Sequence, residues 1–120
     1  MENITIAAWQ KQVDDWIKSI GVRYFSPMSN MLELIEEVGE VARIVNRTAG
    51  EQSFKKTDPA QEDPMRYLGD EIADCIFALT CLANQHGIDL TVALERNTDK
   101  RNGRDKTRHM NNAKLTGTTY

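Results

Sequence analysis

Residues 28–46 read MSNMLELIEEVGEVARIVN and carry an apolar side chain at every third or fourth position. This spacing is that of one face of an α-helix, which completes a turn about every 3.6 residues. Two starts are open for this helix. One is Ser26 as the capping residue with Pro27 at the first helical position, and the other is Asn30 with Glu33 three residues later. The apolar positions are Met31, Leu34, Val38, Val41 and Val45. The segment therefore predicts an amphipathic helix.

Three further segments follow the same helical period, over about residues 5–19, 63–86 and 89–101. Asp63 and Asp89 are polar capping residues at the starts of the last two segments, and the first two segments are followed by Gly21 and Gly87, which are typical helix stops. Alternating patterns of the β type are too short to build a sheet. We expect an all-α protein whose four antiparallel helices form a bundle-like domain.

Length and composition favour one folded domain, residues 1–108, and a flexible, disordered C-terminal tail, residues 109–120. The 120 residues are 40% hydrophobic, which is enough for a single core. The chain beyond residue 108 has few apolar side chains with which to order itself. The connection over residues 47–62 is long for a helix bundle. Because it contains Lys55 and Lys56, it is either a mobile basic flap or a disordered connection.

Charge is distributed unevenly along the chain. The net charge is −3, yet residues 1–95 hold 8 basic and 16 acidic residues, whereas residues 96–120 hold 7 basic and 2 acidic ones. The acidic body excludes a broad cationic surface for non-specific binding to a nucleic acid polymer. Apolar runs are too short for a membrane span and the N-terminus lacks a secretion signal pattern, so we expect a cytoplasmic protein. Cys75 and Cys81 match neither a redox pair nor a zinc site, and we expect buried free thiols.

Carboxylates flank the apolar faces of two predicted helices. They are Glu33, Glu36, Glu37 and Glu40 on the second helix and Glu71 and Asp74 on the third. The first four fall within an arc of about 100°. If the two helices pack antiparallel through their apolar faces, four carboxylates converge from both. Two carboxylates about 4 Å apart repel each other by about 4 kcal/mol at an effective dielectric constant near 20, so the cluster requires a counterion.

Oxygen ligands alone favour a hard divalent cation, Mg²⁺ or alternatively Mn²⁺. A Glu-x-x-His pair, which di-iron helix bundles use, is absent from the sequence. Gly39 lies among the glutamates, and a glycine inside a helix costs about 1 kcal/mol relative to alanine. We therefore expect another group to come close to the helix at Gly39.

These motifs resemble those of a known family. EEVGE at 36–40 followed by EIAD at 71–74 is similar to the EExxE…ExxD signature of the MazG-like all-α nucleotide pyrophosphohydrolases. The likeness extends to YFSP at 24–27, KK at 55–56, CLAN at 81–84 and KRNGRDKTR at 100–108. These additional segments resemble the short, single-domain bacterial branch of the family, and together they cover about residues 5–108.

The resemblance implies Mg²⁺-dependent hydrolysis of nucleoside or deoxynucleoside triphosphates, normal or modified, to the monophosphate and pyrophosphate. It implies that Glu37, Glu40, Glu71 and Asp74 are the metal ligands and that Glu36 orients a ligand or a water molecule. A metal held there would reduce the charge of the triphosphate and lower the pKa of a water molecule.

The resemblance also implies that the basic C-terminal motif binds the β- and γ-phosphates. Its candidates are Lys100, Asn102 and Arg104, and Lys56 in the long connection is a further substrate-binding candidate. The alternative for the C-terminal cations is that they only stabilise the end of a helix. Trp16 either stacks on a nucleobase or packs in the core or at a subunit contact.

Phe77 and Leu82 lie off the main apolar stripe of the third helix, which indicates packing against a second copy of the chain. We expect a homodimer or tetramer, and the resemblance is consistent with a site lined by more than one subunit.

Two alternatives to the expected function remain open at this point. One is an enzyme similar to phosphoribosyl-ATP pyrophosphohydrolase, and the other is a helical interaction module without catalysis.

Overall fold

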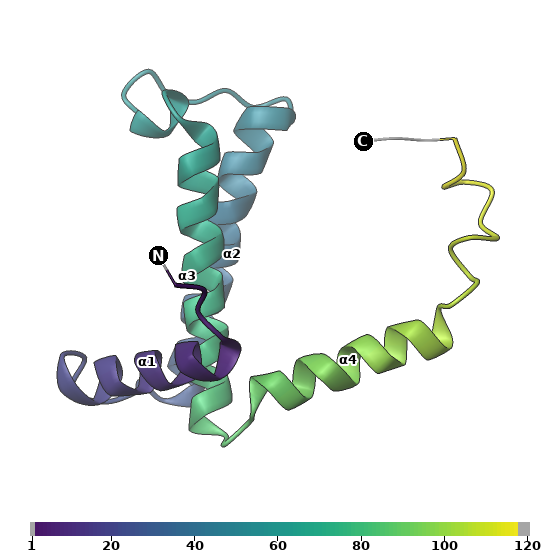
Figure 1. Ribbon diagram of the computed structural model, residues 1–120. Helices are drawn as coiled ribbons and strands as arrows, with labels where there is room; N and C mark the ends of the chain where they lie inside the picture. The colour runs from purple at the N-terminus through teal and green to yellow at the C-terminus, as the bar shows by residue number, and fades with distance from the viewer. Residues whose placement is uncertain (1, 118–120) are drawn as a thin grey trace.

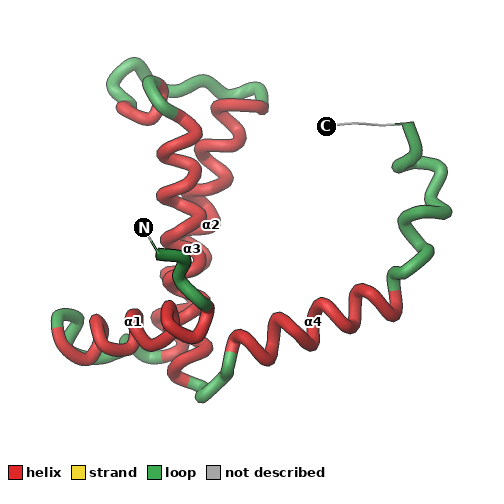
Figure 2. Tube along the Cα trace, in the orientation of Figure 1, coloured by secondary structure: helices red, strands yellow, loops and turns green. Residues whose placement is uncertain are grey.

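The computed structural model describes residues 2–117, and every regular element within them is a helix (Figure 1, Figure 2). The elements are α1 (Ile6–Ser19), α2 (Pro27–Ala49), the short 3-10 helix η1 (Pro59–Gln61), α3 (Pro64–Gln85) and α4 (Leu90–Arg104). The four α-helices agree with the four predicted segments to within a few residues. The predicted all-α fold class is therefore confirmed.

Each α-helix begins at a polar capping residue: Asp63 and Asp89 are the predicted ones, Ser26 rather than Asn30 opens α2, and Thr5 opens α1. The side chains of Thr5, Ser26 and Asp63 each accept a hydrogen bond from the backbone N–H three residues later. Asp89 accepts from the N–H groups two and three residues later. These bonds satisfy backbone donors that have no partner within the helix, so local sequence is sufficient to set where the helices start.

The antiparallel pair of α2 and α3 is the centre of the fold, and its packing is the most extensive contact between helices (Figure 1). Ile44 on α2 is completely buried. The connection after α2 returns through η1, whose Ala60 is also completely buried. Arg43 donates a hydrogen bond to Asp58 just before η1, which ties this connection back to α2.

Helix α1 crosses the end of the α2/α3 pair where α3 finishes (Figure 2). Its buried residues Val13 and Ile17 form a small core with Cys81 of α3. Trp9 packs against this core, and its indole N–H donates to the hydroxyl of Thr80 at 2.8 Å. One polar bond within an apolar contact thus fixes the position of α1 along α3.

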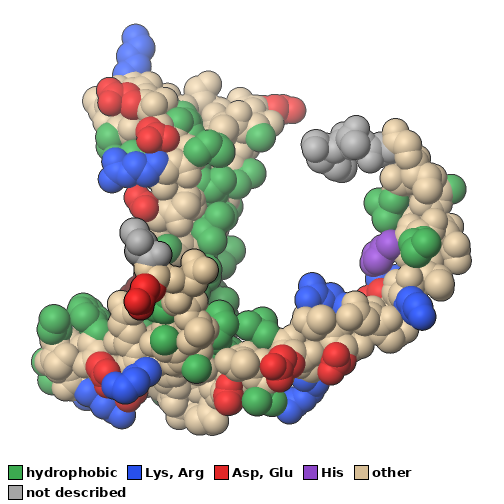
Figure 3. All heavy atoms as spheres, in the orientation of Figure 1, with side chains coloured by type: hydrophobic (Ala, Val, Ile, Leu, Met, Phe, Trp, Pro, Cys, Tyr) green, Lys and Arg blue, Asp and Glu red, His purple; other side chains and the backbone are tan. Residues whose placement is uncertain are grey.

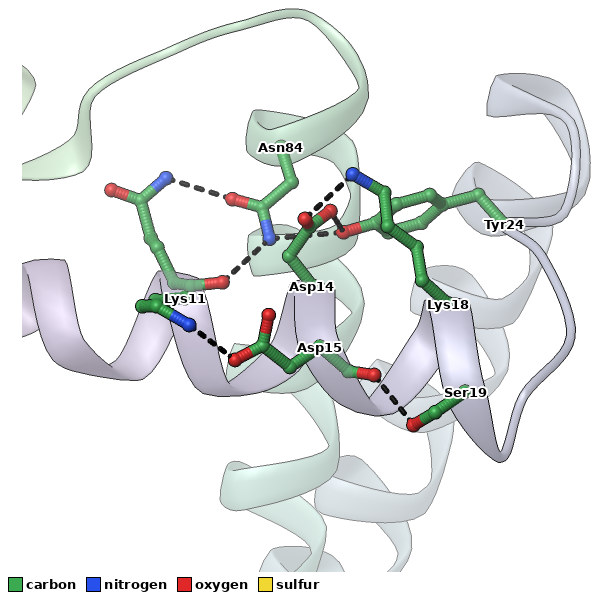
Figure 4. Close-up of polar contacts among 8 residues, drawn as sticks. Lys11, Asp14, Asp15, Lys18, Ser19, Tyr24 and Asn84 are labelled. Atoms are coloured by element: carbon green, nitrogen blue, oxygen red, sulfur yellow. Dashed lines mark hydrogen bonds and ion pairs between the residues drawn. The ribbon is translucent and has the colours of Figure 1, made fainter.

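A second set of polar contacts joins α1, the loop after it and the end of α3 (Figure 4). The hydroxyl of Tyr24 donates to Asp14 at 2.7 Å and accepts from the amide of Asn84 at 3.1 Å. The Asn84 amide also donates to the backbone carbonyl of Gln10 at 3.0 Å. These bonds hold the segment from Gly21 to Ser26 against the helices, which matters for the site described below.

Helix α4 projects away from the α2/α3 pair and packs mainly against α1 (Figure 1). None of its residues is fully buried. Residues 105–117 continue from it as a series of turns. The last residues of the predicted tail, 118–120, lie outside the described residues, and the flexibility of the tail remains a prediction.

The apolar face expected to pack α2 onto α3 is largely exposed in the single chain. Leu34 and Val41 on α2 and Leu68 on α3 are half-buried. The members that expose between 44% and 52% of their surface are Met31, Val38 and Val45 on α2 with Ile72, Ile76 and Leu79 on α3. Figure 3 shows hydrophobic side chains running along this helix pair. The expected packing of α2 on α3 is therefore made, but within one chain it leaves about half of the surface of these six side chains exposed, because α1 covers only one end of the pair.

Gly39 lies on α2, and a Cβ atom built there would meet nothing within 4 Å in the described part of the chain. The close approach predicted from this glycine is therefore not made by the described residues of the chain.

Within residues 2–117, no helix combines the length and hydropathy that crossing a membrane requires.

Truncating the most buried side chain of α2 tests this description of the core. We expect Ile44→Ala to lower the free energy of unfolding by about 3 kcal/mol, because it leaves a cavity in a completely buried position. Ile20→Ala is the matched control, since Ile20 is 72% exposed and should cost less than about 1 kcal/mol. Urea titration followed by circular dichroism at one fixed protein concentration measures both. Equal losses would contradict the assignment of Ile44 to the core.

Candidate active site

Three carboxylates from the two central helices converge. Oxygen atoms of Glu37 on α2 and of Glu71 and Asp74 on α3 all lie within 4.8 Å of one another. Glu71 and Asp74 are three residues apart and so share one side of α3, and the antiparallel pairing brings Glu37 opposite them. Sequence analysis predicted this convergence between helices, and the structure brings these three residues together.

Burial and mutual repulsion both act on this cluster. Burial is the largest cause that raises the pKa of Glu37, followed by the negative charges of Asp74 and Glu71. Burial likewise raises the pKa of Glu71, followed by the charges of Glu40 and Asp74, while the positive charge of Arg43 offsets part of the effect. Without a cation, the ionised cluster therefore destabilises the fold.

The donor set fits a hard divalent cation. Every member of the cluster offers carboxylate oxygen, which is the ligand type that Mg²⁺ and Mn²⁺ prefer. Cys75 lies next to Asp74 in sequence, but burial and the charge of Glu37 raise the pKa of its thiol. Both cysteines are free, as expected, although Cys81 is buried and Cys75 is only half-buried. A thiol that resists ionisation is a poor metal ligand, so the oxygen atoms define the cluster.

Two predicted site residues lie outside the group of three. The carboxylate of Glu40 accepts a hydrogen bond from Nε of Arg43 at 2.9 Å, although its charge still contributes to the raised pKa of Glu71. Glu36 is exposed on α2. Arg43, one helical turn after Glu40, offers that carboxylate a cationic partner, which explains why Glu40 does not turn into the cluster.

A cavity of about 300 Å³ opens beside the carboxylates. Glu37 and Asp74 form part of its wall, and aromatic side chains form much of the rest. The aromatic residues are Trp16, Tyr24, Phe25 and Phe77. A volume of this size lies at the lower end of the range for small-molecule sites.

Trp16 forms one wall of this cavity and remains 46% exposed. Its ring meets that of Phe77 edge to face, with the ring centroids 5.9 Å apart. Tyr24 forms another part of the wall, where burial and the hydrogen bond to Asp14 raise its pKa to about 12. The phenol therefore stays protonated at neutral pH, and its role in the wall is that of an uncharged ring.

Sequence analysis missed two polar residues of the cavity, Arg23 and Asn30, and assigned no role there to Glu33. The available signal was their position around the YFSP motif and the polar Asn30 close to the start of an apolar helix. The loop before the motif is unusual, because Val22 has a φ of 73°, which β-branched residues rarely adopt. This turn brings Arg23 to the cavity, and periodicity alone does not reveal it.

The predicted phosphate-binding residues lie elsewhere in the chain. Lys100, Asn102 and Arg104 are exposed on α4, which projects away from the carboxylates (Figure 1). Arg104 donates two hydrogen bonds to Asp105, each at 3.1 Å. Lys56 is exposed in the connection before η1. None of these four lines the cavity, so within one chain the structure does not bring them to the carboxylates.

The all-helical fold thus gathers carboxylates suited to a hard divalent cation beside an aromatic cavity. Residues 25–109 match the MazG nucleotide pyrophosphohydrolase domain. This match covers more than half of the chain and includes all the clustered carboxylates, and the chain therefore belongs to the MazG family. It is a nucleotide pyrophosphohydrolase of a metal-dependent kind, so the alternative of a non-catalytic interaction module is not supported.

Individual relatives agree with this assignment. YpjD of Bacillus subtilis (strain 168) is 40% identical over 108 residues, which are 90% of this chain and 93% of that protein. The crystal structure of YpjD from Bacillus subtilis superimposes with a TM-score of 0.71 at 38% identity, covering 87% of this chain and 99% of that one. A Bacillus-conserved MazG protein, described as a nucleotide pyrophosphohydrolase, gives a TM-score of 0.70 at 38% identity, covering 88% and 98%.

Removing one charge from the cluster should stabilise the metal-free protein. In the presence of a chelator at pH 7, we expect Glu71→Gln to raise the free energy of unfolding by about 1 kcal/mol, the repulsion of two charges about 4 Å apart in water. Because the pKa of Glu71 is raised, its destabilising effect is full above that pKa and fades as the pH falls towards the ordinary value of 4.5. The gain should shrink over the same range.

Urea titrations at several pH values measure this difference. Glu36→Gln is the matched control, because Glu36 is exposed on α2 and lies outside the cluster. It should change stability by less than about 0.5 kcal/mol. A loss of stability in Glu71→Gln at pH 7 would contradict the repulsion described here.

Proposed function

We propose that this protein hydrolyses nucleoside or deoxynucleoside triphosphates, normal or modified, to the nucleoside monophosphate and pyrophosphate in a reaction that requires Mg²⁺. The observation that carries the proposal is the position of Glu37 and Asp74, which belong both to the carboxylate cluster and to the wall of the aromatic cavity. A nucleotide whose base lies in the cavity has its phosphates next to the carboxylates. We assign it to the cytoplasm, where its substrates are found.

The ligands that we propose for Mg²⁺, or for Mn²⁺ in its place, are Glu37, Glu40, Glu71 and Asp74. A cation held by them would reduce the charge of the triphosphate, polarise the phosphorus and make a water molecule more acidic. We propose that Glu40 joins the other three by turning away from Arg43, since the two are linked by a partly exposed ion pair that contributes little stability. Glu36 on the same helix orients a ligand or a water molecule.

We also propose that a second copy of the chain completes the site. The exposed apolar face of α2 and α3 is suited to burial between subunits, which supports a homodimer or tetramer. Lys100, Asn102 and Arg104 on the projecting α4 then bind the phosphates from the neighbouring subunit, together with Lys56. Trp16, on the cavity wall, stacks on the base.

Release of pyrophosphate from a set of normal and modified triphosphates tests the reaction. With Mg²⁺, we expect the wild-type protein to release pyrophosphate and Asp74→Asn to reduce kcat at least about 100-fold with unchanged helical circular dichroism. Asp70→Asn is the matched control, because Asp70 is exposed one turn earlier on α3. It should keep the wild-type rate. Glu40→Gln should lose activity as Asp74→Asn does, and an unchanged rate would remove Glu40 from the site.

Mixing two inactive variants tests whether subunits share the site. Asp74→Asn damages the carboxylate half and Lys100→Ala damages the phosphate-binding half. In a random mixture of dimers, about a quarter of the sites would combine two intact halves, so activity should return. A mixture of Asp74→Asn with Glu71→Gln is the control and should stay inactive, because both changes affect the same half. No recovery, in a sample shown by mass spectrometry to contain mixed oligomers, would place both halves in one subunit.

A further inference from the structure

Asn30 is a polar side chain in the aromatic cavity that the reaction described above does not use. It is only 6% exposed, yet it contributes to the cavity wall. Its amide nitrogen donates to Oε1 of Gln85 at 2.8 Å and lies 3.5 Å from the backbone carbonyl oxygen of Phe25. A buried amide of this kind has two ends with opposite hydrogen-bonding character, and which end faces the cavity decides what the cavity can bind.

The neighbouring hydrogen bonds determine the orientation of the Asn30 amide. The carbonyl oxygen of Phe25 can only accept, so the amide nitrogen of Gln85 must face it, as the bond between them requires. Gln85 therefore turns its oxygen towards Asn30, and Asn30 must donate to it. The remaining end of the Asn30 amide is the oxygen Oδ1.

The Oδ1 atom of Asn30 accepts no hydrogen bond from the described part of the chain. Within the described residues, every buried side-chain polar atom has a hydrogen-bond partner. Because Oδ1 of Asn30 has no partner, it must keep some surface accessible to solvent, although the residue as a whole is buried. The open space next to Asn30 is the cavity. An occupant without an N–H group at this point would leave the oxygen unpaired, which carries a desolvation penalty.

Two other polar groups of the cavity complete a pattern. Glu33 lies three residues after Asn30 on the same side of α2, which adds a second acceptor. Arg23 lies on the loop side and uses one guanidinium nitrogen to bond the carbonyl of Tyr24 at 2.8 Å, which leaves other N–H groups as donors. The wall therefore offers two acceptors on α2 and the donors of one guanidinium group on the loop.

We infer that the cavity selects nucleobases that carry an exocyclic amino group beside an unprotonated ring nitrogen, with Asn30 Oδ1 accepting from the amino group. Cytosine and adenine have this arrangement, with two N–H bonds for Asn30 and Glu33 and a ring nitrogen for Arg23. Uracil, thymine and hypoxanthine have no exocyclic amino group and present a carbonyl beside a ring N–H, which is the reverse. Guanine carries both arrangements, with its 6-carbonyl beside N1–H and its 2-amino group beside the unprotonated N3. The inference rests on the proposed function, because it assigns the cavity to the base of the substrate.

Paired substrates that differ only in this edge of the base test the inference. In dCTP against dUTP and in dATP against dITP, the amino group is replaced by a carbonyl. We expect the wild-type protein to prefer the amino member of at least one pair by at least about tenfold in kcat/KM. Asn30→Leu keeps the volume but removes the acceptor, so the ratio should fall towards one. A wild-type ratio of one or less in both pairs, or an unchanged ratio in Asn30→Leu, would overturn the inference.

Gln85 provides a second test that does not alter Asn30. Gln85→Glu loses the donor to the Phe25 carbonyl and should lower stability, but it keeps an acceptor facing the Asn30 nitrogen and should preserve the preference. Gln85→Leu frees the amide to rotate and should reduce the preference. If Gln85→Leu lowers kcat/KM equally for dCTP and dUTP, and equally for dATP and dITP, its effect is merely structural. Such equal losses would count against a positioning role for Gln85. This pair of variants carries the test if Asn30→Leu does not fold.

Binding of nucleosides separates this inference from the proposed function. Deoxycytidine and deoxyuridine have no phosphate and need no metal, so their binding can be followed by chemical shift changes in the NMR spectrum of the wild-type protein. If no triphosphate is hydrolysed but deoxycytidine binds more tightly than deoxyuridine at the cavity, the proposed function fails and the selectivity stands. Equal binding of deoxycytidine and deoxyuridine, together with equal binding of deoxyadenosine and deoxyinosine, would reject the selectivity.

Discussion

Antiparallel packing of α2 on α3 is the constraint on which the rest of the molecule depends. It brings Glu37 against Glu71 and Asp74, and the resulting repulsion and burial raise the pKa values of both glutamates. Such an arrangement is unfavourable without a cation, so the apolar contacts of the helix pair must offset it. The same unfavourable charge is what makes the cluster suitable for binding a metal and, through it, a triphosphate.

Helix α1 turns this electrostatic feature into a site of defined shape. The bond from Trp9 to Thr80 and the contacts of Tyr24 with Asp14 and Asn84 hold α1 and its following loop across the end of α3. The space between them and the carboxylates is the aromatic cavity. Because one wall is apolar and the adjacent wall is acidic, the two parts of a nucleotide meet different surroundings in a single site.

The local features of the fold followed from the sequence. Helix periods and the caps at Ser26, Asp63 and Asp89 predicted the helices, since capping depends on residues within one turn. The spacing of Glu71 and Asp74 predicted a shared helix side. The cavity was not predictable in the same way, because Arg23 and Asn30 come together with α3 only through the turn at Val22 and the bonds of Gln85.

The sequence by itself determined the all-α class, the helix limits and the carboxylates available for a metal, because each of these depends on neighbours within a few residues. Only the tertiary structure decided that Arg43 binds Asp58 of the connection, that α4 projects from the body and that Asn30 forms part of the cavity wall. It also decided that the apolar face of α2 and α3 stays exposed. These features depend on which helices meet and at what angle, and periodicity along one helix carries no information about its partner.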